Sequence, residues 1–293
     1  MLELDFAFFN MRDSNRQGLA NRKSFLDRLA PVLFSPRVKQ LIHFGKLGFK
    51  GCNVLLPLGE GNWSILNPHS RGRMIEKTEA ILNNYELPRM GVDRRLKSLF
   101  LTQEYSLPIV FGDHFISALA AILVEKTMAL QDIKKLILVG DIPDMCPLLN
   151  NVSRYHIPIS VQNYHPVRNE IMVHRLLYEK GLAVSNSYVN PHNWGRGDLI
   201  VSFEPGSRSL AIASPEVFGI RLDDDSSGLA PELEQVLAEA GLNPKINTLA
   251  PILETCLLAQ AGYLNPNGED IHQALIDAGD GIGIWEPFLD NGL

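Results

Sequence analysis

Cysteine is scarce in this chain of 293 residues, and the number of cysteines is odd. Cys52, Cys146 and Cys256 lie far apart in the sequence. A disulfide framework needs paired cysteines and a zinc knuckle needs closely spaced ligands, so the sequence predicts neither. The acidic run 223–225 lacks the spaced oxygen ligands and the distal glutamate of a calcium loop. We therefore expect reduced thiols and no metal site.

Long apolar runs and an excess of basic charge are also missing. The apolar stretch near the N-terminus is interrupted by Asp5, Asn10 and Arg12, so it is neither a secretory signal nor a membrane span of about 20 apolar residues. Charged residues make up 20% of the chain and the formal net charge is -6, which does not favour a nucleic acid as partner. We expect a cytoplasmic protein with no nucleic-acid or membrane partner. A homodimer is compatible with this composition.

Short apolar runs alternate with longer helical patterns along most of the chain, which is typical of an α/β protein with a largely parallel sheet. Hydrophobic residues make up 45% of the sequence, enough for one large core or two moderate ones. In the first third, the pattern predicts strands over 4–9 and 51–56 and helices over 23–33 and 70–83. Pro88 and Gly91 then break the pattern, and a long apolar helix begins near Asp113.

The alternation continues beyond that point and starts with a βαβ unit. The predicted strands cover 135–139, 158–162, 182–185 and 198–203, and the predicted helices cover 147–155, 167–180, 232–240 and 250–261. This order is expected of a doubly wound, dinucleotide-type domain with up to six strands. We predict two domains: an N-terminal α/β substrate-type domain over 1–112 and a Rossmann-like, doubly wound parallel-sheet domain over 113–264. The segment of about 265–293 is expected to pack back on the first domain.

Four short stretches occur in a fixed order along the chain. They are Gly-Cys-Asn-Val-Leu-Leu-Pro at 51–57, the helix start at 112–119 with Phe115, Ala118 and Leu119, Gln-Asn-Tyr-His at 162–165 followed by Arg168, and Asp-Leu-Ile-Val at 198–201. Together they resemble the shikimate dehydrogenase-like superfamily, over most of the chain. The resemblance implies a two-domain oxidoreductase that transfers hydride between NADP and a small polar substrate bound in an interdomain cleft.

The resemblance also implies which residues form the sites. Cys52 and Asn53 lie in the substrate strand, where Asn53 would hydrogen-bond a substrate hydroxyl or carboxylate. Asp113 and His114 lie at the family's catalytic loop, where a carboxylate beside an imidazole could exchange a proton near neutral pH. The expected cofactor contacts are Gly140, Asp141, Gln162, Asn163, His165 and Arg168. A cation after this strand, with no acid at its end, favours NADP over NAD.

Several family positions carry other residues in this chain. Gly59 stands where the family has its catalytic lysine, Phe111 stands near the catalytic aspartate, and Leu55 replaces the threonine of the substrate strand. Glycine has no side chain that could transfer a proton. The phosphate turn, Gly-Asp-Ile-Pro-Asp-Met at 140–145, has one glycine where the dinucleotide fingerprint has two or three. The carboxylate of Asp141 would also repel a pyrophosphate.

Each candidate has an alternative interpretation without a function. Cys52 could be the nucleophile of a thioester-reducing enzyme, but free cysteines are usually buried. Asp113 and His114 fit a helix cap followed by a surface histidine, and the turn at 162–168 fits an ordinary polar connection. The sequence leaves two functions open. One is an NADP-dependent oxidoreductase with an unknown small polar substrate, and the other is a catalytically degenerate binding or regulatory protein that uses the interdomain cleft.

Overall fold

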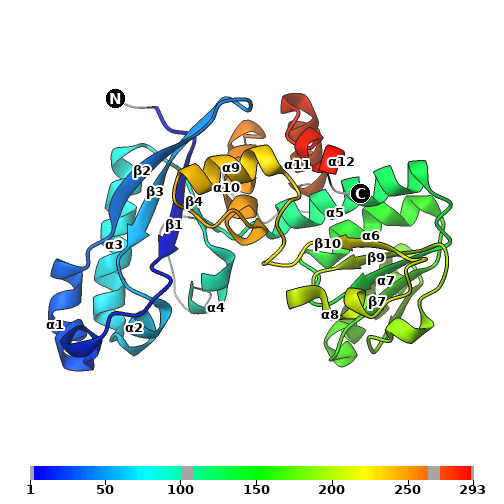
Figure 1. Cartoon of the computed structure of the whole chain (residues 1–293), viewed down its shortest axis with the longest axis horizontal. Helices are drawn as coiled ribbons and strands as arrows, with labels where there is room; N and C mark the ends of the chain where they lie inside the picture. Colours follow the sequence, from blue (N-terminus) through cyan, green and yellow to red (C-terminus); the bar gives the residue numbers. More distant parts are fainter. Residues whose placement is uncertain (1–2, 101–107, 263–270, 292–293) are drawn as a thin grey trace. The chain divides into compact units, whose positions relative to one another are not determined.

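The computed structural model describes residues 3–100, 108–262 and 271–291 of the chain. They form two compact units, each with one five-stranded sheet and its helices (Figure 1). Unit 1 is assigned the ranges Met1–Gly112, Gln235–Pro244 and Thr248–Pro266. Unit 2 is assigned the ranges Asp113–Glu234, Lys245–Asn247 and Asn267–Leu293. The α/β fold class predicted from the sequence is confirmed.

The sheet of unit 1 has the strand order β2-β3-β1-β4-β5. Its strands are β1 Phe6–Met11, β2 Arg37–Phe44, β3 Phe49–Leu56, β4 Met90–Val92 and β5 Ile109–Val110. β2 pairs antiparallel with β3, whereas β3, β1, β4 and β5 pair in parallel. The carboxyl ends of β1, β3 and β4 therefore lie at one edge of the sheet, which is where ligands bind in open α/β sheets.

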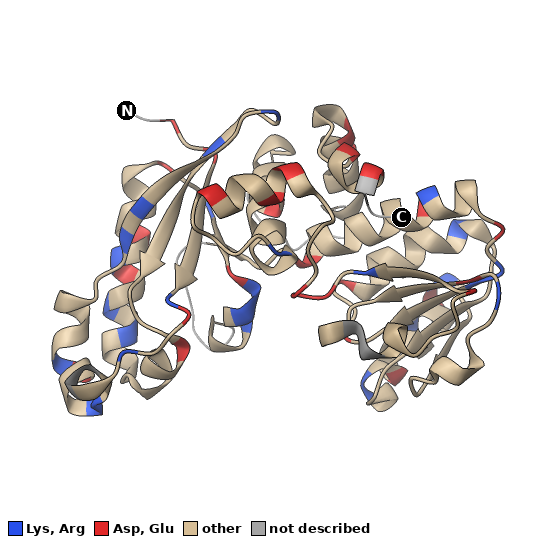
Figure 2. Ribbon diagram, in the orientation of Figure 1, with Lys and Arg blue, Asp and Glu red and all other residues tan. Residues whose placement is uncertain are grey.

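The strand β2 was missed by the sequence prediction. Its eight residues include Arg37, Lys39 and His43, and they contain no continuous apolar run. β2 forms an edge of the sheet, and Lys and Arg residues mark it and the turn that follows (Figure 2). Charged side chains on an edge strand discourage pairing with another sheet, so a polar sequence is compatible with this position.

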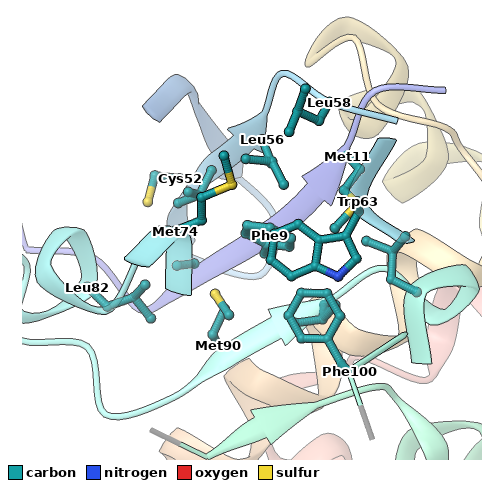
Figure 3. Close-up of a cluster of buried hydrophobic side chains, with 14 of the residues drawn as sticks. Phe9, Met11, Cys52, Leu56, Leu58, Trp63, Met74, Leu82, Met90 and Phe100 are labelled. Carbon is teal, nitrogen blue, oxygen red and sulfur yellow. The ribbon is translucent and has the colours of Figure 1, made fainter. Parts of the chain in front are cut away.

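The helices in the first part of unit 1 are α1 Lys23–Leu33, α2 Glu60–Ile65, α3 Pro68–Asn84 and α4 Lys97–Phe100. α1 and α3 contribute side chains to a hydrophobic cluster on one face of the sheet (Figure 3). Alternate residues of β1 and β3 face this cluster, as the period of two in a strand requires: Ala7, Phe9, Met11, Cys52, Val54 and Leu56. Trp63 and Phe100 close one side of it, with stacked rings whose centroids are 6.0 Å apart.

Two helices from late in the chain, α9 Pro231–Glu239 and α10 Ile246–Gln260, contribute most of their residues to unit 1. A side chain at Gly91 would lie 2.8 Å from the carbonyl oxygen of Pro251, and one at Gly112 would lie 2.6 Å from the nitrogen of Pro251. α10 therefore packs directly against the backbone at both glycines. The segment that returns to unit 1 is this helix, which the sequence assigned to the second domain.

The sheet of unit 2 is entirely parallel and has the order β10-β9-β6-β7-β8. Its strands are β6 Lys135–Val139, β7 Ile159–Gln162, β8 Val184–Ser187, β9 Asp198–Ser202 and β10 Phe218–Arg221. Numbered within the unit, this is the Rossmann order 3-2-1-4-5, with the switch point between β6 and β9. The described residues of the unit supply five strands, where up to six were expected.

The helices of unit 2 include α5 Asp113–Leu130, α6 Met145–Val152, α7 Glu170–Lys180, α8 Arg208–Ala211, α11 Ile271–Ile282 and α12 Glu286–Asn291. α11 and α12 correct the prediction that the C-terminal segment packs on the first domain. Phe115 of α5 stacks on Trp285, with ring centroids 5.2 Å apart, and also contacts Phe288. A side chain at Gly279 would lie 2.3 Å from the Trp285 ring. The glycine in this helix therefore admits the tryptophan, and these aromatic contacts hold α11 and α12 in unit 2.

Short 3-10 helices complete the fold at η1 Gly18–Asn21, η2 Arg94–Leu96, η3 Ser153–Tyr155, η4 Pro166–Asn169, η5 Pro191–Asn193 and η6 Pro205–Ser207. Throughout the described ranges, each helix is too short or too polar to traverse a lipid bilayer.

Candidate functional site

The turn after β6 lies at the switch point of the unit 2 sheet and brings together three of the predicted cofactor residues. Gly140 has φ 97°, and a side chain there would lie 3.0 Å from the backbone nitrogen of Glu204 in the loop after β9. The side-chain amide of Asn163, after β7, donates to the carbonyl oxygen of Gly140 at 3.1 Å and to Oδ1 of Asp141 at 2.8 Å. The loops after β6, β7 and β9 therefore meet at this position.

Two carboxylates, Asp141 and Asp144, lie within this turn, and the backbone of Glu204 lies beside Gly140. Tyr164 donates a hydrogen bond to one oxygen of the buried Glu204 at 2.6 Å, and Ser209 donates to the other oxygen at 2.6 Å. The first turn of α6 contains Pro147, which has no N–H to donate. A pyrophosphate needs N–H donors and positive charge at this position. The residues present do not fit the pyrophosphate of a dinucleotide.

His114 and Asp144 form a hydrogen-bonding contact that the sequence analysis missed. Nδ1 of His114 lies 2.6 Å from Oδ2 of Asp144, and both side chains are about a quarter exposed. Asp144 has φ 47°, a left-handed conformation that is unfavourable for a residue other than glycine. A carboxylate on Nδ1 fixes the orientation of the imidazole, as in general acid–base pairs. Asp113 precedes His114 as the first residue of α5.

Of the remaining predicted cofactor residues, Gln162 is buried, whereas His165 and Arg168 are exposed. Oε1 of the buried Gln162 accepts hydrogen bonds from Nε1 of Trp194 at 3.1 Å and from the backbone of Asn190 at 3.2 Å. These bonds hold the loop before β9 in place. His165 and Arg168 are exposed, and the guanidinium of Arg168 makes no ion pair within the described residues. A cation is therefore accessible at the position that the resemblance assigns to a 2′-phosphate.

The two predicted substrate residues lie on opposite faces of β3 in unit 1. Cys52 is fully buried in the hydrophobic cluster, and burial raises the pKa of its thiol to about 11 (Figure 3). This environment favours the structural interpretation of Cys52, since the thiolate is the reactive form. Asn53 is also fully buried, and neither polar atom of its side chain has a partner among the residues described. A buried amide without partners is unusual, so Asn53 stays a candidate ligand contact.

Gly59 cannot carry a side chain in this structure. A Cβ atom at this position would lie 2.9 Å from both the backbone Cα and the backbone nitrogen of Asn15. The segment containing Asn15 is fixed by Asn62, whose side chain accepts from the backbone nitrogen of Arg16 at 2.6 Å and donates to Oδ1 of Asn21 at 2.9 Å. Packing thus leaves no space for a lysine at position 59.

A pocket of about 250 Å³ opens at the carboxyl edge of the unit 1 sheet. Its lining follows the ends of β1, β3 and β4, and it consists of Met11, Arg12, Asp13, Asn15, Glu60, Gly61, Asp93, Arg95 and Leu96. The sequence analysis missed this site, because its charged residues come from three separate connections and none forms a known motif. For the part of the chain described, no group of His, Cys, Asp and Glu residues suits a metal ion.

An ion pair between an exposed arginine and a buried carboxylate lines one wall of this pocket. Asp93 is buried, and Nε of Arg95 lies 3.1 Å from both of its carboxylate oxygens, while Nη2 lies 2.7 Å from one of them. Nη1 of Arg95 also donates to Asp13 at 3.2 Å. The hydrogen bond to Asp93 raises the pKa of Arg95 above its ordinary value. This bidentate pair fixes the guanidinium and neutralises the buried carboxylate.

Replacing Gly59 by alanine is expected to lower the free energy of unfolding by about 1–3 kcal/mol, because the new Cβ must displace the backbone of Asn15. The matched control is Gly72→Ala in α3, where a Cβ meets no atom within 4 Å. That change should stabilise the protein by about 0.5–1 kcal/mol, the usual gain for alanine in a helix. Urea unfolding followed by circular dichroism measures both values. If Gly59→Ala and the wild type have the same free energy of unfolding, then Asn15 leaves space for a side chain at residue 59.

The three cysteines are expected to react with iodoacetamide in a defined order in the folded protein. Cys146 is partly exposed, whereas Cys52 and Cys256 are fully buried and burial raises the pKa of both thiols. At about pH 8, Cys146 should be labelled first, and the other two should react only after unfolding in urea. Peptide mass spectrometry identifies the labelled residue. Rapid labelling of Cys52 in the native protein would instead favour the thioester-reducing interpretation.

Comparisons with known proteins give likenesses to solved structures. No protein-family model matches this chain, and no curated protein matches it significantly. Among solved structures, the chain is similar to the crystal structure of L-tryptophan dehydrogenase from Nostoc punctiforme, with 12% sequence identity and a TM-score of 0.40. The match covers 96% of this chain and 80% of that chain. A likeness at this level does not assign an activity, and the Rossmann order of unit 2 is established by its own strand pairing.

Proposed function

We propose that this protein binds a small polar organic acid in the pocket of unit 1 and that it does not use a dinucleotide. The proposal corresponds to the binding or regulatory function that the sequence left open. One observation carries it: the turn after β6, where a Rossmann fold holds a pyrophosphate, itself contains two carboxylates, Asp141 and Asp144, and Asp141 is held there by Asn163. Negative charge there opposes the binding of NADP or NAD.

The charges of the unit 1 pocket favour a ligand with a carboxylate. Arg12 is exposed and, within the described ranges, its side chain makes no ion pair. A guanidinium recognises a carboxylate through two parallel hydrogen bonds. Asp13 and Glu60 also line the pocket and can accept hydrogen bonds from hydroxyl or amine groups of the same ligand. The volume of about 250 Å³ suits a small metabolite.

Packing at the same edge of the sheet supports binding without turnover. The family's proton-transferring lysine has no space at Gly59, because the backbone of Asn15 lies against it. The guanidinium of Arg95 is held by Asp93, and an arginine remains protonated under ordinary conditions. Neither position therefore supplies the amine that would pass a proton to a substrate oxygen.

A second candidate function is the NADP-dependent oxidoreductase. The Rossmann strand order and the accessible guanidinium of Arg168 favour it. In this function Arg168 and His165 would meet the 2′-phosphate, and Asn53 would contact a polar substrate. His114, oriented by Asp144, would serve as the acid or base. The acidic turn at Asp141 is the feature that this candidate leaves unexplained.

Thermal unfolding with about 1 mM NADPH, NADP or NADH should show no stabilisation, whereas a ligand at 100 times its Kd would stabilise by about 2.7 kcal/mol. The reason is repulsion between the pyrophosphate and the carboxylates at the turn. A shift with NADPH that disappears in Arg168→Ala but persists in the matched surface variant Arg28→Ala would reject the proposal and support the oxidoreductase. Arg28 is an exposed arginine on α1 of unit 1.

Stabilisation by lactate, malate, succinate or glutamate at roughly 10 mM is expected for at least one acid. Arg12→Ala should abolish the shift, since a hydrogen bond to a charged group contributes about 1.5–3 kcal/mol. Arg28→Ala again serves as the control and should keep the wild-type response. A response that survives in Arg12→Ala, or no response to any of these acids, would count against binding at this pocket. Isothermal titration calorimetry then gives the Kd of the responding acid.

A further inference from the structure

The first turn of α11 contains a buried histidine that is only half satisfied in hydrogen bonding. His272 is 5% exposed, and its Nε2 is buried with no hydrogen-bond partner among the described residues. The ring also makes a hydrogen bond to the backbone of Ser117 in α5, which favours the protonated ring. Nδ1 therefore donates to the carbonyl of Ser117, and Nε2 carries the lone pair of a neutral imidazole. A proton at Nε2 would have no acceptor in this position.

His272 lies beside the pair of His114 and Asp144. The carboxylate of Asp144 favours a charge on His272, whereas a charge on His114 opposes it. The hydroxyl of Ser117 donates to the backbone carbonyl of Asp144 at 3.4 Å. All four residues belong to unit 2. The start of α11, the first turns of α5 and the turn before α6 therefore meet at one cluster of ionisable side chains.

This cluster offers one carboxylate to two imidazoles. His114 is about a quarter exposed and its Nδ1 lies 2.6 Å from Oδ2 of Asp144, so a proton taken up by His114 forms an ion pair there. A further proton on His272 would then meet a like charge and a carboxylate that is already paired. The other acids of α5 and α11 near this cluster lie just before His114 or more than one turn beyond His272: Asp113, Asp277 and Asp280.

We propose that protonation of His272 releases the first turns of α11 from α5, so that this contact is a pH-sensitive element of unit 2. Burial opposes the charged imidazole, and a positive charge at the start of a helix is also unfavourable to the helix dipole. In the released segment, water solvates the charged ring. The stacking of Trp285 on Phe115 holds the later part of this region, so the release is local.

The direction of the pH dependence follows from the same burial, which lowers the pKa of His272 below its ordinary value. The released state then binds a proton more readily than the packed state. The contact is therefore at full strength above about pH 6.5, the ordinary pKa of histidine, and weakens as the pH falls below it.

Hydrogen–deuterium exchange of the full chain at about pH 7.5 and about pH 5.5 tests the release, after correction for the intrinsic exchange rates. Opening of the segment 271–278 should increase about five- to tenfold at the lower pH, because uptake of one proton changes the equilibrium at most tenfold per pH unit. The strand β6 in the same unit serves as the internal reference and should show no comparable change.

His272→Asn should remove the pH dependence, because asparagine keeps an N–H donor near the position of Nδ1 but cannot be charged. The control His43→Asn changes an exposed histidine of β2 in unit 1 and should behave as the wild type does. Since the first variant also loses packing, an NMR titration of the wild-type His272 ring gives a second measurement and should yield a pKa below about 6.5. A pKa at or above this value, exchange that does not change with pH, or a pH dependence that persists in His272→Asn would each overturn the proposal.

Discussion

The side-chain amide of Asn62 is the interaction on which the candidate site of unit 1 depends. It accepts from the backbone of Arg16 and donates to the carbonyl of the same residue and to Asn21, so it binds the segment after β1 to the turn after β3. This attachment brings Asn15 against Gly59 and removes the space for a side chain there. It also sets Arg12 and Asp13 beside Glu60 at the edge of the sheet. One buried amide thus both leaves no space for a side chain at residue 59 and shapes the pocket.

In unit 2 the strand order is that of a Rossmann fold, but the charged residues of its loops differ from those that bind a pyrophosphate. Its five parallel strands have the Rossmann order, and Gly140 allows the loops after β6 and β9 to approach closely. The strand order determines where a ligand could bind, whereas the charges of the connections determine which ligand is accepted. Here Asp141 is held by Asn163, and the carboxylate of Glu204 is held by Tyr164 and Ser209. A pyrophosphate at this turn would therefore meet the carboxylate of Asp141, held there by Asn163.

The sequence predicted those parts of the fold that have a regular apolar pattern. The helix at 23–33 and the strand at 135–139 have the predicted bounds, because a strong local pattern coincides with burial. β2 was missed because an edge strand need not be apolar. α11 was missed because its sequence contains glycines, which disfavour a helix, whereas in the structure Gly279 lies against Trp285. The acidic turn at Asp141 was visible in the sequence. The pairing of His114 with Asp144 and the grouping of Arg12 with Glu60 are tertiary contacts across 30 or more residues, and no local pattern reports them.

The obstacle at Gly59 and the obstacle at the turn after β6 have different physical origins. At Gly59 the obstacle is steric, because the backbone of Asn15 occupies the space of a side chain. At the turn after β6 the obstacle is electrostatic, because the carboxylates disfavour a phosphate group. Restoring a lysine would not remove the negative charge in unit 2, and neutralising Asp141 would not open space in unit 1. A single substitution therefore cannot remove both obstacles. This independence supports the proposed binding function.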